Sequence, residues 1–464
     1  MKHRWFSFLL ALIILLPFGE VWAQSETPPG PVYIVQEGDY LSSIAERFGV
    51  SVEDLIAYNR LANPDLLKAG DQLVIPGLEG IEGQLQTKSV SLGDTLRSLS
   101  RRYQFPVAML VKLNHLSSPD ELYVGSNLVV LTRPDEKPYN KRSMISAGQS
   151  LLELAVLQGV NPWTIVAING LEGSWAGLPG DVLLLPGDDP EGAGGLPPSL
   201  HAASLEPFPL VQGKTAIIQV STVAGITLAG NLAGRELHFS PENEGKLVAL
   251  QGIYAKEEPG IYPLTLKGSL PDGTSFGFNQ MVYIQDGGYP LDPTLYVDPA
   301  TIDPEVTEPE NAQWAALVSV FTPEKYWQGA FGIPVDAAFA DCWPSRFGSR
   351  RSYNDGPYDF FHTGLDYCGQ VGHPIYAPAA GVVVFTGFLT VRGNATLIDH
   401  GWGVYTGYLH QSELLIHAGE RVEKGQLIGR IGATGRVSGP HLHWEVIAGG
   451  VQVNPMDWLD QEYP

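Results

Sequence analysis

The stretch GPHLHWEV, residues 439–446, places two histidines two positions apart in a segment typical of a β-strand. Side chains in a strand alternate between its two faces, so His441 and His443 project from the same face. Both imidazoles can then contribute to one site. An isolated pair of this kind is more often structural, so its interpretation depends on whether the chain supplies partners.

A second polar pair lies upstream in FHTGLDYCG, residues 361–369. His362 and Asp366 share one face of a strand there; a helix would also bring them together, but Gly364 and the flanking aromatic residues favour a strand. Imidazole nitrogens and carboxylate oxygens are ligands that zinc accepts, usually three from the protein plus a water at a catalytic site. The sequence therefore predicts a zinc site on this pair and one histidine of 439–446.

Histidines also gather in this part of the chain, which holds seven of the eleven between residues 362 and 443. His410, at the end of the alternating run GVYTGYLHQS (403–412), is a further candidate for a place beside the metal. Structural histidines alone do not readily explain such clustering.

These motifs resemble a known family. HTGLD (362–366), YLH (408–410) and HLHWEV (441–446) look like the signature of lysostaphin/LytM-type zinc endopeptidases, which cut peptide bonds in bacterial peptidoglycan. The resemblance covers roughly residues 327–460 and implies a Gly-rich, mostly antiparallel β-domain. The twelve glycines between residues 381 and 439 fit tight hairpins. The residues that the resemblance implies are His362, Asp366 and His443 as zinc ligands and His410 and His441 as the catalytic pair.

The ligand set defines the chemistry that we expect. Two neutral imidazoles and one carboxylate leave Zn²⁺ with a net positive charge, which polarises the scissile carbonyl and lowers the pKa of a bound water toward ~7. We assign to His441 the transfer of the water's proton to the leaving amine, because it shares a strand face with His443. His410 then donates a hydrogen bond to the oxyanion. The sequence leaves the reverse assignment open.

The first 23 residues, MKHRWFSFLLALIILLPFGEVWA, have the basic start, apolar run and small-residue end of a signal peptide cleaved after Ala23. The apolar run is shorter than the ~20 residues that a membrane span needs, and no later segment is apolar enough. We therefore expect a secreted or cell-envelope protein, in the periplasm or cell wall, without a membrane span after cleavage. The net charge of −22 argues against partners such as nucleic acid or an anionic membrane.

Residues 32–186 contain an internal repeat with a period of 55 residues. The period indicates three copies of one unit, each with a strand, a glycine turn, two short helices and a closing strand. We place the copies at residues 32–76, 86–132 and 142–186. The matched positions include Gly38, Gly93 and Gly148, and also Asn59, Asn114 and Asn169.

The first copy, VQEGDYLSSIAERFGVSVEDLIAYN (35–59), resembles the lysin motif, LysM, a module that binds chains of N-acetylglucosamine. The resemblance implies glycan contacts around Asp39, Tyr40 and Leu41 and in the loop 63–69. The alternative is that the modules only pack against one another as spacers. That alternative stays open, and more so for the second and third copies, which match less well.

The rest of the chain completes a multidomain architecture. A Gly/Pro/acidic linker is expected over 187–207 and an Ig-like all-β sandwich of seven strands over 208–288. The sandwich carries no cluster that suggests chemistry, so it is expected to act as a spacer or to lie against the catalytic groove. An extended Pro-rich connector follows over 289–312, and an all-β peptidase domain over 313–464.

The chain has two cysteines, Cys342 and Cys368. Export makes a disulfide the default interpretation. In the alternative, Cys368, two residues after Asp366, is a fourth zinc ligand that keeps the enzyme latent. That arrangement would close the position that water needs for catalysis.

The sequence thus predicts a secreted zinc endopeptidase that hydrolyses peptide cross-links or stem peptides of peptidoglycan and is targeted by its glycan-binding LysM modules. Two other classes remain. One is a non-catalytic wall-binding protein that activates another hydrolase. The other is a structural envelope or coat protein that binds glycan and holds no metal.

Overall fold

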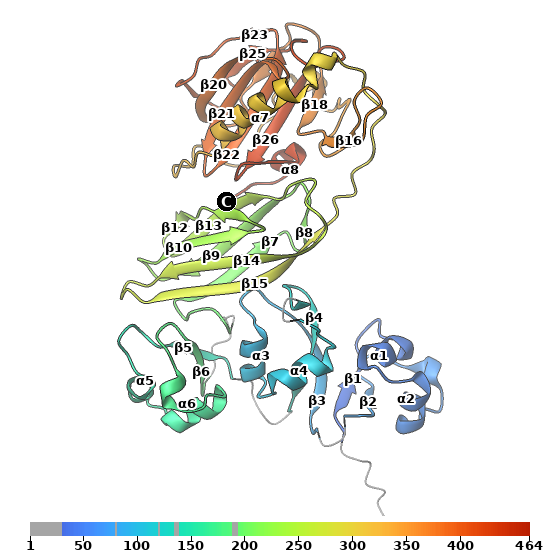
Figure 1. The fold of residues 1–464 in the computed structure, drawn as a ribbon, viewed down its shortest axis with the longest axis vertical. Coiled ribbons are helices and arrows are strands. Elements are labelled where there is room, and N and C mark those ends of the chain that lie inside the picture. Colours follow the sequence, from blue (N-terminus) through green and yellow to red (C-terminus); the bar gives the residue numbers. More distant parts are fainter. Residues whose placement is uncertain (1–29, 79–80, 119–120, 134–138, 188–193) are drawn as a thin grey trace, which may run out of the picture. The chain divides into compact units, whose positions relative to one another are not determined.

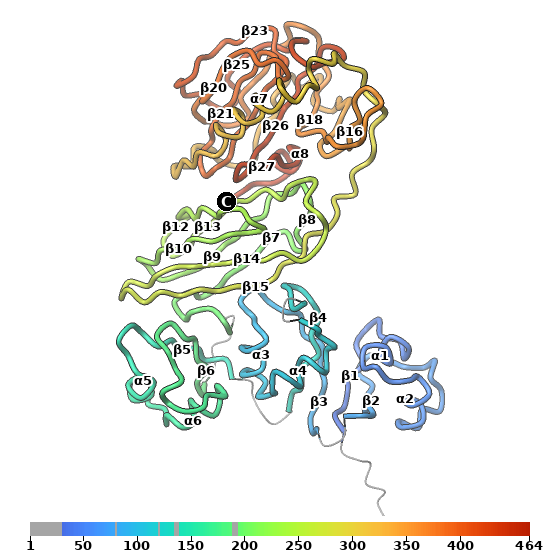
Figure 2. Tube along the Cα trace, in the orientation of Figure 1, coloured from blue at the N-terminus to red at the C-terminus, as the bar shows by residue number. Residues whose placement is uncertain are grey.

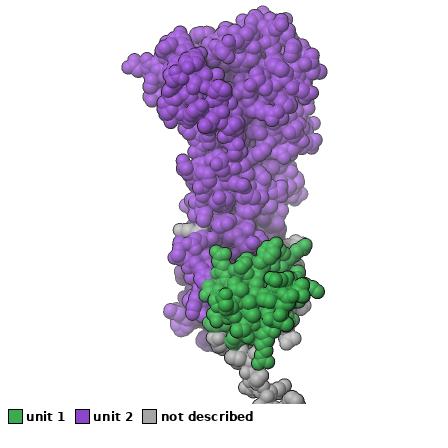
Figure 3. All heavy atoms as spheres, turned by 90° about the vertical axis from the view of Figure 1, so that its right-hand side faces the viewer, with its two compact units in different colours: residues 1–85 green, residues 86–464 purple. Residues whose placement is uncertain are grey.

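The computed structural model describes residues 30–78, 81–118, 121–133, 139–187 and 194–464. The signal peptide expected over residues 1–23 lies outside these ranges. Contacts within the chain divide it into two compact units, residues 1–85 and 86–464 (Figure 3). Figure 2 traces the chain through both units.

The first unit holds the first module. It comprises β1 (Val32–Ile34), α1 (Leu41–Phe48), α2 (Val52–Asn59), a 3₁₀ turn (Pro64–Leu66) and β2 (Gln72–Val74), and β1 pairs with β2 antiparallel. Ser51 caps α2 by accepting a hydrogen bond from the amide of Asp54 at 2.9 Å. The Asn59 side chain joins α2 to β2, because its amide group donates to Leu55 O and Val74 O while its oxygen accepts from Val74 N.

The second and third modules repeat this order. Their elements are β3 (Gln84–Ser89), α3 (Leu96–Arg102), α4 (Val107–Leu113) and β4 (Asn127–Thr132), then β5 (Lys141–Met144), α5 (Leu151–Gln158), α6 (Pro162–Ile168), η3 (Ser174–Ala176) and β6 (Val182–Leu185). Asn114 and Asn169 make the same bonds as Asn59, to Val129 and Leu184. Observed strands begin and end within two residues of the expected module bounds.

A two-sheet sandwich follows within the second unit (Figure 1). One sheet has the order β11-β10-β14-β15-β8 and the other β12-β13-β9-β7. The predicted C-terminal boundary of the linker, residue 207, is wrong. Strand β7 already begins at Leu200, and Leu200 and Leu205 are buried in the sandwich core. The strands are β7 (Leu200–Glu206), β8 (Leu210–Val211), β9 (Thr215–Thr222), β10 (Thr227–Leu232), β11 (Arg235–Leu237), β12 (Ser240–Asn243), β13 (Lys246–Gly252), β14 (Gly260–Ser269) and β15 (Ser275–Gln285).

The C-terminal region is built on an antiparallel seven-stranded sheet of order β18-β26-β22-β21-β20-β24, with β27 paired to β26. A smaller sheet, β19-β25-β23, packs beside it, so the expected mostly antiparallel β-domain is observed. The elements are β16 (Arg350–Arg351), β17 (Phe360–Phe361), β18 (Leu365–Cys368), β19 (Pro374–Tyr376), β20 (Gly381–Leu389), β21 (Gly393–Gly401), β22 (Val404–Gln411), β23 (Glu413–Leu414), β24 (Arg421–Val422), β25 (Leu427–Arg430), β26 (His441–Ala448), β27 (Val451–Val453) and α8 (Pro455–Asp460).

The connector over 289–312 differs from the expected extended chain in its second half. Its first half does run extended beside β16, with Leu291 bridged to Arg350. Helix α7 (Pro304–Val318) then begins, capped by Asp303 with Pro304 in its first turn, where proline is tolerated. Figure 1 shows α7 running across the face of the seven-stranded sheet. Trp314 and Val318 of this helix are buried against residues of β21, β22 and β26.

The sandwich shares a core with the C-terminal region, which agrees with the expected alternative that it lies against this region. Val248 and Leu250 of β13 belong to the same buried cluster as Trp444 of β26 and Trp458 of α8. The indole of Trp458 also donates to Thr215 of β9 at 3.2 Å. These contacts make the two regions one packed body, as burial of shared apolar surface requires.

A helix that crosses a bilayer must be both long and apolar. In the described part of the chain, no single helix meets that requirement. The neighbouring helices α5 and α6 meet it only when taken together, and the chain bends by 109° between them.

Candidate metal centre and catalytic groove

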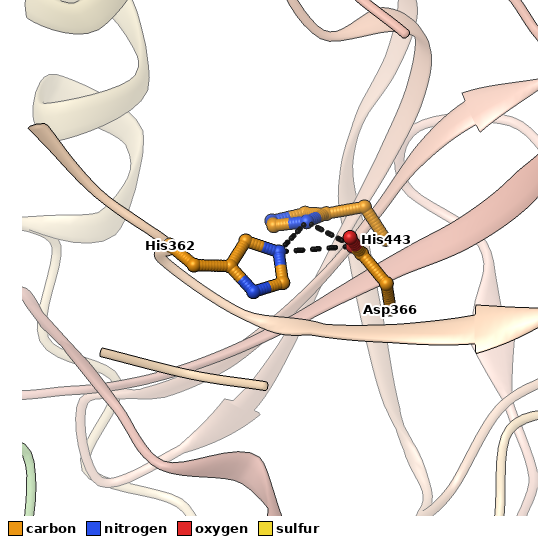
Figure 4. A group of neighbouring side chains, drawn as sticks. All are labelled: His362, Asp366 and His443. Atoms are coloured by element: carbon orange, nitrogen blue, oxygen red, sulfur yellow. Dashed lines mark hydrogen bonds and ion pairs between the residues drawn. The ribbon is translucent and has the colours of Figure 1, made fainter. Parts of the chain in front are cut away.

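Three side chains from three neighbouring segments converge at one point (Figure 4). His362 follows β17, Asp366 lies in β18, and His443 lies opposite Asp366 in β26. His362 Nε2 is 2.9 Å from Asp366 Oδ1 and 2.9 Å from His443 Nδ1, and the last two atoms are 2.8 Å apart. All three residues are buried.

Gly364 allows this approach. A Cβ at this position would lie 2.3 Å from Trp444 O and 2.8 Å from His443 Nε2. Any larger residue would therefore push β18 away from β26. This steric constraint explains why the HTGLD motif has glycine at position 364.

The donor set fits a zinc ion. Two ring nitrogens and a carboxylate oxygen all point at one position, and no placement of protons lets three such atoms satisfy one another. A bound cation satisfies all three, and two histidines with one carboxylate form a known zinc ligand set that leaves a position for water.

Outer contacts fix the tautomers of both histidines. The Nδ1–H of His362 donates to Arg346 O at 2.9 Å, so its Nε2 lone pair faces the centre. The Nε2 of His443 faces Glu445 Oε1 at 3.4 Å, which leaves its Nδ1 lone pair for the metal. Glu445 in turn accepts from Trp314 Nε1 at 3.1 Å and from Thr363 at 2.6 Å.

The electrostatics of the ligands also favour a bound cation. Burial lowers the pKa of His362 to about 4, so this imidazole is neutral at physiological pH. Burial by itself raises the pKa of Asp366, but the charge and hydrogen bonds of His362 and His443 hold it well below its usual range. For these two residues, a neutral imidazole and an ionised carboxylate are the forms that coordinate metal. The pKa of His443 moves the other way: burial by itself lowers it, but hydrogen bonds to Asp366 and Glu445 raise it, so a cation has to displace a proton from this ring.

His410 and His441 lie beside this centre, as the sequence predicted. The Nδ1–H of His441 donates to Gly439 O at 2.9 Å, and its Nε2 lies 3.6 Å from Asp366 Oδ1. The Nδ1–H of His410 donates to Thr434 O at 2.8 Å, and the two ring centroids are 5.1 Å apart. With Nδ1 as the donor in each ring, Nε2 is the nitrogen that faces the centre.

Cys342 and Cys368 form a disulfide. The alternative that Cys368 is a fourth zinc ligand is therefore wrong, because its sulfur is bonded to Cys342. The disulfide ties the segment before β16 to β18, the strand that carries Asp366.

The predicted glycan contacts have different environments. Asp39 is engaged inside the first module, where it accepts from Tyr33 OH at 2.6 Å and Gln36 N at 2.8 Å. Leu41 is buried, whereas Tyr40 is 72% exposed. Of the three side chains, Tyr40 is the one that presents an open surface to a ligand.

The metal centre opens into a cavity of about 760 Å³. Its lining includes His410 and His441, but also Trp314 from α7, Leu295 from the connector and Tyr254 from the sandwich. The contribution of Tyr254 agrees with the expectation that the sandwich lies against this groove. The sequence did not indicate the contribution of Trp314 or the role of Glu445. Glu445 carried a usable signal, because it lies two residues after His443 on the same strand face.

Comparison with known proteins agrees with this geometry. Residues 360–455 match the model of Peptidase family M23, and residues 33–76 and 89–130 match that of the LysM domain. The predicted resemblances to LytM-type peptidases and lysin motifs are thereby confirmed, with the LysM matches covering the first two copies.

Individual relatives match the C-terminal part. The peptidoglycan DD-endopeptidase ShyA of Vibrio cholerae is 46% identical over 123 residues, which are 26% of this chain and 28% of that one. The DD-carboxypeptidase/endopeptidase Mpg of Neisseria meningitidis is 45% identical over 95 residues, 20% and 22% of the two chains. The solved structure of lysostaphin from Staphylococcus simulans shows 27% identity and a TM-score of 0.23, covering 26% of this chain and 49% of that one. The chain thus spans less than a third of the length of the two curated relatives.

Proposed function

We propose that this protein is a zinc-dependent endopeptidase of the cell envelope that hydrolyses peptide bonds of bacterial peptidoglycan. The observation that supports it most is the convergence of His362, Asp366 and His443 with His410 and His441 beside them. Relatives of the matched region are named peptidoglycan DD-endopeptidases, which supports the same substrate class.

Zinc on these three ligands would polarise the scissile carbonyl and lower the pKa of a bound water. His441 is the proton acceptor in this proposal. Its Nδ1–H is fixed on Gly439 O, so Nε2 carries a lone pair directed toward the centre, from which it takes the water's proton and returns it to the leaving amine.

The role of His410 as a hydrogen-bond donor to the oxyanion depends on its protonation state. Its Nδ1–H is used on Thr434 O, so Nε2 donates to an oxyanion only in the imidazolium form. Burial, together with the nearby His443 and His441, lowers the pKa of His410 well below its usual range and favours the neutral form. The donor role would therefore require His410 to take up a second proton from solvent; in its neutral form His410 can accept a proton at Nε2 but not donate one.

The N-terminal part is proposed to bind glycan. All three copies share the same asparagine link between the second helix and the closing strand, so we assign the third copy to the same module type as the first two. We also interpret the sandwich as Ig-like: its sheets β12-β13-β9-β7 and β11-β10-β14-β15-β8 correspond to strands D-E-B-A and C′-C-F-G-A′ of that fold. Glycan binding would hold the enzyme at the wall despite its net charge of −22.

The decisive experiment is incubation of the zinc-loaded full chain with purified muropeptides, with mass analysis of the products. We expect cleavage by the wild type and none by Asp366→Ala, because the latter loses a ligand. His417→Ala is the matched control, since that ring is exposed and lies outside the cavity. If the wild type released no new products from the muropeptides, the non-catalytic wall-binding alternative would be favoured.

Sedimentation with insoluble peptidoglycan tests the targeting role. Removal of residues 30–78, which hold the first module, should lower the bound fraction and leave cleavage of small soluble peptides intact. Equal sedimentation of the shortened and full chains would contradict a contribution of the first module.

A further inference from the structure

Three guanidinium groups line the cavity around the metal centre, those of Arg351, Arg392 and Arg436. Two of them already have acidic partners. Arg392 pairs with Glu310 of α7 at 2.8 Å, and Arg351 lies between Asp366 at 3.5 Å and Asp292 of the connector at 3.7 Å. Their charges are largely compensated inside the protein.

Arg436 differs from the other two. Its guanidinium lies over the ring of Tyr353, with Cζ 4.5 Å from the centroid, and its Nη1 donates to Thr301 O at 3.1 Å. Among the described residues, no carboxylate lies within ion-pair distance of it. Arg436 is half-buried, and this burial lowers the pKa of its guanidinium. A partly desolvated cation without an anion is unfavourable unless a ligand supplies one.

The position of Arg436 relative to the catalytic residues is fixed. It lies five residues before His441, in the segment that leads into β26. Its amide donates to Val391 O at 2.8 Å. Gly435 has φ +77° and packs so closely on residues 391–393 that a Cβ would lie 2.4 Å from Gly393 N. This close packing holds the guanidinium in the wall of the groove.

We propose that Arg436 binds a free carboxylate of the peptide substrate and thereby selects acidic over neutral peptides. The inference rests on the proposed peptidase function and adds a substrate feature to it. A guanidinium binds a carboxylate through two parallel N–H···O bonds, and stacking on Tyr353 holds its plane in one orientation. The metal ligands and the catalytic pair act on the peptide bond itself and do not distinguish a carboxylate from its amide. Arg436 is therefore a specificity-determining residue in this proposal.

The test uses the zinc-loaded full chain and two synthetic peptides that differ at one group, a carboxylate or a carboxamide on the residue next to the scissile bond. We expect the wild type to cleave the acid with the higher kcat/KM, mainly through a lower KM. In Arg436→Gln the ratio of acid to amide should fall on the order of 10- to 100-fold. Arg436→Lys should show an intermediate ratio, because lysine keeps the charge and loses the two-pronged geometry.

Arg421→Gln is the matched control. Arg421 also stacks on a tyrosine, Tyr326, at 5.1 Å, but it lies outside the cavity, so its loss should leave the ratio unchanged. A wild type without preference for the acid, or an Arg436→Gln variant that slows both peptides equally, would overturn the proposal.

Binding provides a second measurement that does not need turnover. The zinc-loaded wild type is titrated in a calorimeter with two uncleavable peptide analogues, one with the carboxylate and one with the carboxamide. The carboxylate analogue should bind more tightly. Arg436→Lys should reduce that difference, and this conservative variant serves if Arg436→Gln fails to fold. Acid preference in binding without any cleavage would sink the proposed hydrolysis and support the carboxylate site. Equal binding of acid and amide would refute the carboxylate site, even in an active enzyme.

Discussion

The N-terminal modules and the metal centre both bury polar side chains, but for opposite purposes. Asn169 of the third module has its amide group and its oxygen bonded to the backbone of Ile165 and Leu184, so nothing is left for a ligand. His362 and His443 instead direct lone pairs at each other and at Asp366, an arrangement that only a cation satisfies. Buried polar groups are normally hydrogen-bonded, so convergence without mutual satisfaction is what distinguishes a functional cluster from a structural one.

The largest loss of activity should follow from removing one of the three candidate metal ligands. His443→Ala should lose bound zinc and activity together, with a loss of at least about 10³-fold, because the metal supplies the central chemistry. Metal analysis of the purified variant and a peptide cleavage assay measure both losses. Full zinc occupancy in this variant would contradict the ligand assignment. Removal of zinc from the wild type by a chelator should give the same loss, restored by added zinc.

His400 tests the other side of the comparison, as a buried histidine whose partners are all protein. Its Nδ1 faces Ala380 O at 2.7 Å and its Nε2 faces Thr406 Oγ1 at 2.8 Å. Burial lowers its pKa to about 4. The unfolded chain, with a pKa near 6.5, therefore takes up the proton first on acidification. The stability associated with His400 is complete above pH ~6.5 and falls as the pH drops toward 4, by about 3 kcal/mol.

Urea unfolding of wild type and His400→Gln, followed by tryptophan fluorescence between pH 7.5 and 4, measures this effect. The difference in unfolding free energy between the two proteins should shrink as the pH falls through this window. The exposed His417, substituted in the same way, provides the control. A constant difference across the range would show that His400 does not titrate as its burial requires.

Glu445 shares features of both kinds of buried polar group, the structural ones and those that converge on the metal centre. It is buried and bonded to protein groups, yet one of its oxygens faces the ring of a metal ligand. Glu445→Gln keeps the shape and removes the charge that orients His443. We expect zinc affinity to weaken about 10- to 100-fold. Competition with a zinc chelator of known affinity measures the change, and unchanged affinity would make Glu445 purely structural.

The sequence predicted the features that depend on local patterns. The alternation in residues 441–446 indicated a strand with two histidines on one face, and β26 is that strand. The 55-residue period indicated repeated modules, and the same asparagine link recurs in each of the three copies. Helix α7 was missed, because a Pro-rich acidic segment indicates extended chain. Its helical state depends on burial of Trp314 and Val318 against a sheet formed by residues far along the chain. The shared core of the sandwich and the peptidase region is likewise a long-range property.

The smallest expected effect concerns the repeated asparagines and separates stability from activity. Asn169→Ala removes three hydrogen bonds and leaves the amide and carbonyl of Leu184 without their side-chain partner. An unsatisfied buried backbone group costs roughly 1–3 kcal/mol, so the third module should lose stability by about this amount. Hydrogen exchange of the β6 amides should report the loss locally, whereas cleavage of small peptides and zinc content should stay at wild-type values, because no atom of this module lines the catalytic cavity. The matched change Asn59→Ala should lower protection in β2 to a similar degree. If Asn169→Ala lowered cleavage of small peptides while β6 kept its protection, the division between satisfied structural groups and convergent functional ones would fail at this position.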